Sequence, residues 1–207
     1  MESRNNMNLN LEDLLGAQIN IDKNGMKVIR LSDVKLPYLN NNSVYVKRLE
    51  PTYFAGDLVY GEFRNLCRIH DIAPDYTVAP YALIVDKQGH YVGYLMEAVA
   101  GEDLEIDKRK LMLPGEAREV RSQIVSAMGL LHSKGIGHGD LDYSNIVKYK
   151  KDGQAYIKLI DPAPSLRRKD DERNIREDKK WLKSMMSDYW EDRDVRFTSQ
   201  WKQAKNF

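Results

Sequence analysis

The chain has 207 residues, 42% of them hydrophobic and 30% charged, which indicates a globular protein with one ordinary domain or two small lobes. The formal net charge of +1 excludes an overall electrostatic footprint for nucleic acid or membrane, although it leaves a local basic groove open. The single cysteine, Cys67, excludes an internal disulfide and an all-cysteine metal site, and no apolar run approaches the roughly 18 residues of a membrane span.

The first ten residues are rich in asparagine and have no apolar core, so they do not resemble a secretory signal. We therefore expect a cytoplasmic protein.

The first half of the chain is predicted to form short strands and one helix. Apolar residues at helical spacing predict the helix over residues 56–70. Lys87, Gln88 and Gly89 have the composition of a hairpin turn between two strands. Runs rich in Val, Ile and Tyr predict strands at residues 25–31, 43–49, 81–86 and 90–97.

The second half is predicted to contain two helices with a hairpin between them. Residues 114–134 begin with a proline and stop at Gly135, which is typical of a helix. A hairpin is expected at 146–160 around Lys151-Asp152-Gly153, and a last helix over about 172–189. A boundary near residues 98–101 would place a ligand cleft between two lobes.

Residues with catalytic chemistry concentrate just after the first of these helices. The run His138-Gly139-Asp140-Leu141-Asp142-Tyr143-Ser144-Asn145 is followed, after a predicted strand, by Asp161. Phosphoryl transfer needs a carboxylate that orients the acceptor hydroxyl and oxygen ligands for magnesium. Asp140 suits the first role, and Asn145 and Asp161 suit the second. The alternative interpretation is a polar turn with incidental Asp and Asn caps.

The spacing His-x-Asp-x4-Asn, with an Asp after the next hairpin, resembles the protein-kinase superfamily over roughly residues 28–190. Within it, the chain resembles the small atypical branch that includes the RIO kinases and the KEOPS-complex kinase. The resemblance implies an α+β, two-lobed kinase-like fold with a small β-rich N-lobe and a truncated, mainly helical C-lobe. Its expected parts are an N-terminal extension (1–27), the N-lobe (28–98), the C-lobe (99–190) and a C-terminal tail (191–207).

The resemblance also implies an ATP site. Val44-Tyr45-Val46-Lys47 resembles the Val-Ala-Ile-Lys strand, so Lys47 would bind the α- and β-phosphates and act in catalysis beside Asp140 and Asn145. Glu62, on the next helix, would pair with Lys47, because a carboxylate keeps the lysine charged and oriented beside phosphate. Taken alone, a lysine on a strand is more often solvated surface.

Residues 92–103 resemble the strand and hinge that recognise adenine. Met96 would be the gatekeeper, the backbone of Glu97 and Val99 would pair with the adenine edge, and Asp103 would contact the ribose. An ordinary buried strand followed by a turn explains the apolar residues equally well. The remaining lining of the expected purine slot is Val147 and Ile160.

The segment Arg176-Glu177-Asp178-Lys179 resembles the Glu-Asp-Lys segment of the KEOPS-complex kinase, where the Asp supports the catalytic loop backbone. We therefore expect Asp178 to be a structural support, or otherwise an acid favoured by the dipole at a helix start.

The sequence departs from the kinase pattern at several positions. No Gly-rich loop precedes Lys47, and the Asp-Phe-Gly position is Asp161-Pro162-Ala163, where proline fixes φ and removes a donor. Asp142 replaces the lysine of eukaryotic Ser/Thr kinases, and its carboxylate would repel the γ-phosphate unless it points away or binds metal. Gly139 replaces an arginine. No Ala-Pro-Glu motif follows, and residues 167–180 are densely charged, which indicates a solvated segment.

These features predict an atypical Ser/Thr protein kinase that uses ATP with Mg²⁺ or Mn²⁺ and acts on an unidentified protein. A protein partner would dock at the C-terminal helix or tail. Two alternatives stay open. A small-molecule kinase is one, because His-Gly-Asp loops also occur in aminoglycoside phosphotransferases. A pseudokinase that serves as a binding module is the other, and the missing Gly-rich loop favours it.

Overall fold

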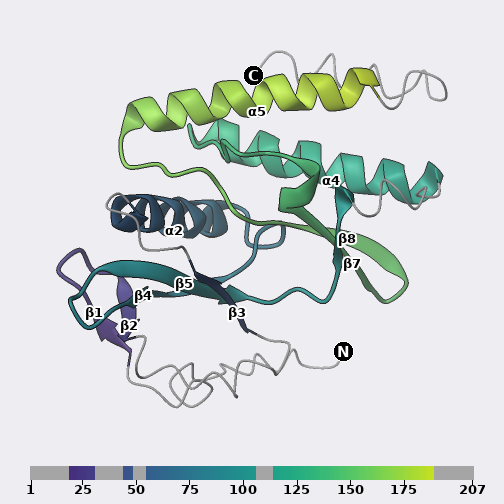
Figure 1. Cartoon of the computed structure of the whole chain (residues 1–207). Coiled ribbons are helices and arrows are strands. Elements are labelled where there is room, and N and C mark those ends of the chain that lie inside the picture. Colours follow the sequence, from purple (N-terminus) through teal and green to yellow (C-terminus); the bar gives the residue numbers. More distant parts are fainter. Residues whose placement is uncertain (1–18, 31–43, 49–54, 106–113, 189–207) are drawn as a thin grey trace. The chain divides into compact units, whose positions relative to one another are not determined.

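The computed structural model describes residues 19–30, 44–48, 55–105 and 114–188, which fall into two compact units (Figure 1). The first contains the described residues up to Tyr60 together with Pro80–Ala98. The second contains Gly61–Ala79 and the described residues from Val99 onward. The first unit is β-rich and the second carries most of the helical residues, which confirms the predicted α+β class. The predicted tail at 191–207 lies outside the described residues.

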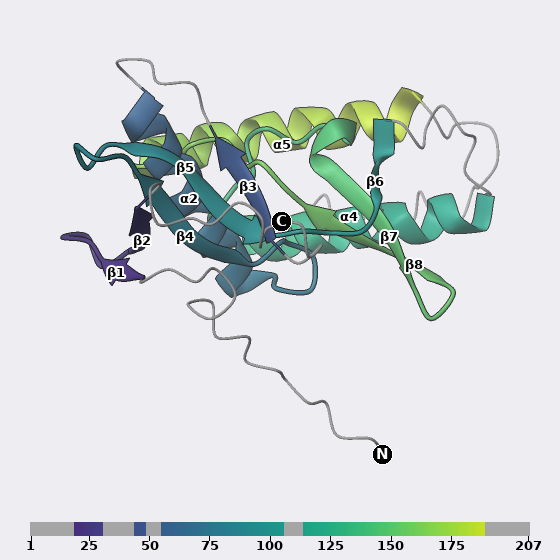
Figure 2. The same cartoon turned by 60° about the horizontal axis from the view of Figure 1, so that its bottom comes forward.

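The first unit is built on one mixed sheet (Figure 2). Its strands follow the order β1-β2-β4-β5-β3, in which only β2 and β4 pair in parallel. One face is apolar because alternate residues of neighbouring strands pack together, among them Ile29, Ile84 and Leu95. The strand bounds are β1 Asn20–Ile21, β2 Lys27–Arg30, β3 Val44–Arg48, β4 Pro80–Val85 and β5 Tyr91–Glu97.

The turn between β1 and β2 is built by local hydrogen bonds of one carboxylate. The carboxylate of Asp22 accepts hydrogen bonds from the backbone of Asn24 and Met26, which forms the turn between β1 and β2. The Tyr91 hydroxyl donates to the same carboxylate at 2.6 Å and ties this turn to β5. Burial and the Asp22 carboxylate raise the pKa of Tyr91 to about 12.

The predicted hairpin at 81–97 is confirmed as β4 and β5. Asp86 shapes the turn, since its side chain accepts hydrogen bonds from the backbone of Gln88 and His90. Gly89 has φ +86°, the left-handed region that favours glycine. Turn chemistry that is local in the sequence therefore sets the register of these two strands.

The second unit packs the helices α2, α4 and α5 and a small sheet around one apolar core. The helices α4 and α5 run beside each other, and the core includes Ile124, Met128 and Leu131 of α4. Among the described residues, no helix is long and apolar enough to cross a membrane. The bounds are α2 Ala55–Ile72, whose first residues belong to the first unit, α4 Pro114–Ser133, α5 Arg168–Asp188, the short 3-10 helix η3 Tyr143–Asn145, and the strands β6 Glu102–Asp103, β7 Ile146–Lys151 and β8 Gln154–Leu159.

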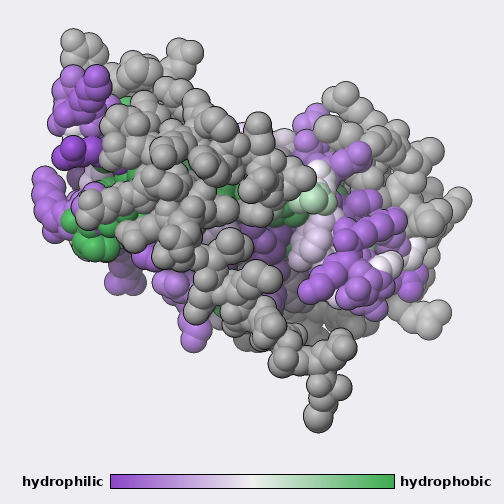
Figure 3. All heavy atoms as spheres, turned by 90° about the horizontal axis from the view of Figure 1, so that it is seen from below, coloured by the Kyte–Doolittle hydropathy of each residue, from purple (hydrophilic) through white to green (hydrophobic). Residues whose placement is uncertain are grey.

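The predicted second hairpin is confirmed as β7 and β8, joined by Asp152 and Gly153 with φ of 52° and 79°. The side chain of Gln123 on α4 binds the free edge of β8, donating to the Ala155 carbonyl and accepting from the Ile157 N–H. Hydrophilic side chains gather over this hairpin (Figure 3). The hairpin is thus fixed to α4. It therefore also fixes the end of the loop that connects α4 to β7.

Candidate active site

The loop with the predicted catalytic residues starts where α4 ends. Gly135 adopts φ +71°, and its N–H donates to the carbonyl of His132 while the N–H of Ile136 donates to that of Leu131. This arrangement satisfies carbonyls at the helix end and turns the chain sharply. The sequence predicted the stop at Gly135, and the loop after it is buried up to His138.

The buried carboxylate of Asp178 on α5 holds the start of this loop. Its oxygens accept hydrogen bonds from the backbone N–H of His138 at 2.8 Å and of Gly139 at 2.7 Å. The Nε2–H of His132, in the last turn of α4, donates to it at 3.0 Å. Asp178 is fully buried. The expectation that Asp178 supports the loop backbone is therefore confirmed.

Two glycines let the loop approach α5 this closely. A Cβ at Gly137 would lie 2.5 Å from the backbone nitrogen of Ile175, and one at Gly139 would lie 2.3 Å from Cγ of Asn174. Gly139 also adopts φ +82°. The glycine at position 139, which departs from the kinase pattern, is explained by this geometry, because a side chain would be both strained and obstructed there.

The structure brings Asp140, Asn145 and Asp161 into one region. The Nδ2 of Asn145 donates to the Asp140 carbonyl at 2.8 Å and to its carboxylate at 3.2 Å. The N–H of Ile160 donates to the Asn145 carbonyl at 3.0 Å, continuing the β7–β8 pairing of Ile146 with Leu159. Asp161 follows directly and adopts φ +55°, which is uncommon for a residue other than glycine.

Asp142 has a structural partner of its own. Its side chain accepts a hydrogen bond from the Ser144 N–H at 3.2 Å and caps η3. The Asp142 carboxylate, which would repel a γ-phosphate if it faced one, is thus engaged in a turn of the loop. Capping at this position also fixes the backbone between Asp140 and Asn145.

His138 links the loop to the end of β8. Its Nε2–H donates to the Ile160 carbonyl at 2.9 Å, and the Ala163 N–H donates to the His138 carbonyl at 2.8 Å. Burial lowers the pKa of His138, although the carboxylate of Asp178 opposes this shift. The neutral ring with its proton on Nε2 therefore fits the site.

Three residues of α2 hold the segment after Asp161, and the sequence pattern did not identify any of them. The Nδ2 of Asn65 donates to the carbonyls of Gly137 and Ala163, so it bridges the loop and this segment. Arg64 donates to the carbonyl of Leu166 at 2.9 Å. Both residues lie in Gly61–Ala79, the part of this region that belongs to the second unit. The predicted lobe bounds stay a prediction.

Arg68 completes this support. It binds both oxygens of Asp171 at 2.9 Å and donates to the Ser165 hydroxyl at 3.1 Å. The Ser165 hydroxyl in turn donates to Asp171 at 2.6 Å. No local motif predicts such a network, since Arg68 lies 97 and 103 positions before its partners Ser165 and Asp171.

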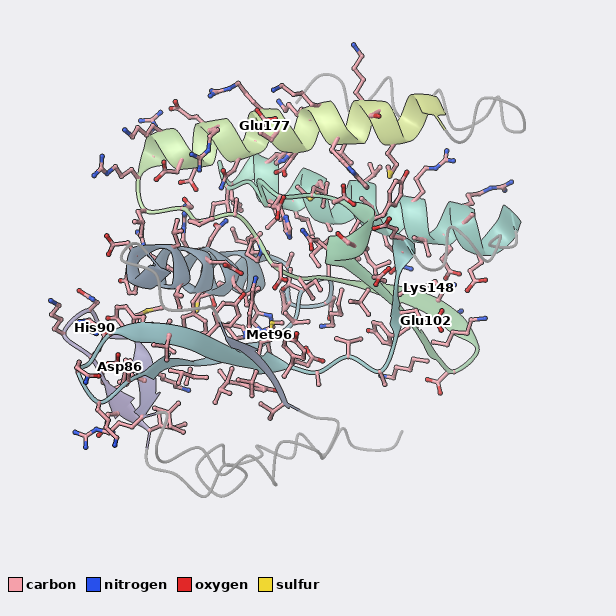
Figure 4. The ribbon with its side chains drawn as sticks, in the orientation of Figure 1. Asp86, His90, Met96, Glu102, Lys148 and Glu177 are labelled. Atoms are coloured by element: carbon pink, nitrogen blue, oxygen red, sulfur yellow. The ribbon has the colours of Figure 1, made fainter. Side chains whose placement is uncertain are left out.

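The predicted nucleotide-contacting residues are distributed over both units. Figure 4 labels one of them, Met96. In the first unit, β3 carries Lys47 and pairs with β5, which carries the buried Met96. The Lys47 Nζ lies 5.8 Å from the centroid of the Tyr94 ring. Glu97 pairs with Val44 on the same two strands. The pairing of Lys47 with Glu62 stays a prediction.

In the second unit, Asp103 on β6 lies opposite Val147 on β7. Val99 accepts a hydrogen bond from the Gly101 N–H, forming a tight turn before β6. A Cβ at Gly101 would lie 2.2 Å from the Lys148 carbonyl oxygen, so the turn needs glycine. Asp103 and Val147 therefore lie on paired strands of the small sheet, and Ile160 directly follows its strand β8. The contacts of these three residues with adenosine stay predictions.

The predicted metal ligands have suitable chemistry. Asn145 and Asp161 offer amide and carboxylate oxygens, which are the donors that Mg²⁺ and Mn²⁺ prefer. Within the described ranges, no group of three His, Cys, Asp or Glu side chains is arranged to hold a metal ion. The magnesium site at Asn145 and Asp161 stays a prediction, in which phosphate and water would supply the other ligands.

No protein-family model matches the chain, and no curated protein matches it. Among solved structures, the chain is similar to the crystal structure of Rad53 1-466 in complex with AMP-PNP, with a TM-score of 0.45 and 24% sequence identity. The match covers 59% of this chain and 32% of that chain. The chain therefore spans less than two thirds of the length of that structure.

Proposed function

We propose that the chain is an ATP-dependent phosphotransferase with a kinase-like fold of two lobes, at residues 28–98 and 99–190, that acts in the cytoplasm on Ser or Thr hydroxyls of proteins. The observation that carries this proposal is the grouping of Asp140, Asn145 and Asp161, with the Asn145 amide bound to Asp140. An incidental turn has no need for this combination of an acceptor-orienting carboxylate with two magnesium-type ligands.

In the proposed reaction, the acceptor hydroxyl oxygen forms a bond to the γ-phosphorus of ATP. The bond between that phosphorus and the β–γ bridging oxygen breaks, and ADP leaves with the electron pair. Asp140 orients the hydroxyl and receives its proton, while the Asn145 amide holds the Asp140 carboxylate in place. Bound Mg²⁺ would neutralise phosphate charge. Asn145 and Asp161 are the residues that would hold it.

Two features of the site support an enzyme that acts on a large acceptor. Asp140 is exposed, so a hydroxyl presented by another macromolecule can reach it. The backbone just before it is held by hydrogen bonds that Asp178 accepts from the N–H groups of His138 and Gly139, and by one that Asn65 donates to the Gly137 carbonyl. Such preorganisation is expected where a reacting carboxylate must be positioned accurately.

The test is transfer of labelled γ-phosphate from ATP, with Mg²⁺ or Mn²⁺, to generic protein substrates and to the chain itself. We expect Asp140→Asn and Asp161→Ala each to reduce transfer by about 100-fold or more. The matched control is Asp152→Asn, which also removes an exposed carboxylate but lies in the β7–β8 turn. It should keep full transfer.

Nucleotide binding, measured as an ATP-dependent rise in melting temperature, separates the alternatives. Asp140→Asn should retain this rise, because Asp140 acts on the acceptor. Binding without protein labelling, followed by ADP release on addition of small hydroxyl compounds, would replace the protein acceptor with a small molecule. Neither labelling nor a rise in melting temperature would contradict the enzyme and indicate a binding module.

A further inference from the structure

The exposed side of α5 carries a row of basic residues at helical spacing. Successive members are separated by four, three, four and three positions, so at 100° per residue they fall within an arc of about 80°. At 1.5 Å per residue the row is about 21 Å long. This basic stripe consists of Lys169, Arg173, Arg176, Lys180 and Lys183, all of them exposed.

The stripe is held on a rigid support. The opposite side of α5 is buried through Asn174, Asp178, Leu182 and Met185. Nitrogen-tipped side chains project from α5 on the side away from α4 (Figure 4). The basic groups therefore keep a fixed spacing along a straight helix.

Positive charge dominates this surface. Between residues 167 and 183 the exposed acidic residues are Glu172 and Glu177, which flank the stripe. Glu177 pairs with Lys180 at 2.7 Å. Arg167, Arg168 and Lys179 add further exposed positive charge beside it. Because the whole chain has a net charge of only +1, this concentration is a local feature and favours a polyanionic partner.

The basic stripe contains no apolar or aromatic residue, and this restricts the class of partner that it fits. Protein interfaces need an apolar or aromatic centre, and helices on membranes need an apolar face. Among the α5 side chains that the structure describes, at residues 168–185, none is an exposed large hydrophobic residue, and Leu182 and Met185 are buried in the core. Single-stranded nucleic acids are bound by stacking bases on aromatic side chains, which the stripe also lacks. Binding to the phosphates of a duplex needs cations alone.

We propose that the basic stripe of α5 binds the phosphate backbone of double-stranded nucleic acid, without reading its sequence. Binding falls steeply with salt, because each neutralised phosphate releases counterions. This surface is independent of the proposed phosphotransfer, since none of its residues belongs to the Asp140 loop.

The test uses the full chain and a fluorescein-labelled DNA duplex of about 25 base pairs, with fluorescence anisotropy over a series of salt concentrations. The variant carries Lys169→Gln, Arg176→Gln and Lys183→Gln together. The matched control carries Lys23→Gln, Lys27→Gln and Lys87→Gln, which remove the same charge from exposed positions of the first unit. Melting temperatures of both variants should equal that of the wild type.

We expect the α5 variant to bind the duplex at least about tenfold more weakly. Its slope of log K against log salt should become shallower by about one for each phosphate that the variant leaves unneutralised. The control should bind within about twofold of the wild type. Equal weakening in both variants, or no binding by the wild type at about 50 mM salt, would overturn the proposal. Tighter binding to polyglutamate or to phosphatidylserine vesicles than to the duplex would overturn it too, in favour of an acidic protein or a membrane.

Discussion

The two units differ in what they bury. In the first unit the core of the sheet is hydrophobic, with residues such as Ile29, Ile84 and Leu95. Among the described residues, the buried polar and charged side chains all lie in the second unit, and they include Asn65 and Asp178. Apolar cores tolerate exchange among hydrophobic side chains when the total volume is kept, whereas a buried polar group is stable only while its partners are in place. The second unit should therefore be much the less tolerant of substitution.

The largest effect is expected from Asp178→Ala. Its removal leaves the buried N–H of His138 and the partly buried N–H of Gly139 without acceptors and also unpairs His132. Each buried unpaired donor costs about 1–3 kcal/mol, so the loss of stability should be roughly 3 kcal/mol or more. Urea unfolding followed by tryptophan fluorescence measures it in the second unit, because all the tryptophans come after residue 98 in the sequence.

The control for this variant is Glu177→Ala, one position earlier on α5. Glu177 is exposed and pairs with Lys180, an interaction of about 0.3–0.5 kcal/mol. A similar loss of stability in both variants would show that α5 is generally fragile and that Asp178 has no special role in holding the loop.

The next effect comes from glycines of the second unit. In Gly137→Ala, the new methyl group would lie 2.5 Å from the Ile175 nitrogen, and we expect a loss of about 1–3 kcal/mol from overpacking. Gly129→Ala, in the exposed interior of α4 with open space around it, should instead gain about 0.5–1 kcal/mol. The same unfolding experiment compares them. A neutral Gly137→Ala would contradict the close packing of the loop against α5.

This contrast also explains what the sequence could predict. Both hairpins were predicted, because Asp86–His90 and Asp152–Gly153 contain their own turn chemistry. The end of α4 was predicted in the same way from Gly135. Sheet order was not predicted, since β4 and β5 separate the two strands that follow each other as β2 and β3.

The candidate site shows the same division. Asp140, Asn145 and Asp161 could be found because a fixed spacing within one loop and hairpin carries them. The supporting contacts of Asn65, Arg68 and Ser165 could not be predicted from the sequence. None of these residue types indicates a special role, and the hydrogen-bond partners lie far away in the sequence. Asp178 was found only through the resemblance of its helix to one kinase.

A smaller effect is expected in the first unit, at the turn between β4 and β5. Gly89 has φ +86° with open space around it, so Gly89→Ala should cost about 1 kcal/mol from backbone strain alone. Gly89→Asn should cost less, because asparagine tolerates this conformation. Hydrogen exchange of the β4 and β5 amides measures the cost. A cost like that of Gly137→Ala would remove the difference between the units.

The smallest effect is a pH dependence of the second unit, and it originates in His138. Burial lowers the pKa of this ring, against the pull of the nearby Asp178, Asp140 and Asp161 carboxylates, so it stays neutral in the folded chain. In the unfolded chain the ring gains a proton as the pH falls below about 6.5. The unfolded state then binds more protons, so the stabilisation is complete above that pH and decreases as the pH falls.

Between about pH 7.5 and pH 6.0 the loss of stability from this ring should reach up to about 0.8 kcal/mol. Urea unfolding with EDTA present measures it, and His138→Gln, which keeps a donor for the Ile160 carbonyl, is the comparison. The variant should lose less stability than the wild type over this range. Equal slopes would mean that the His138 ring can be protonated within the fold, and the loop would then be more open to water than its hydrogen bonds to Asp178 and Ile160 indicate.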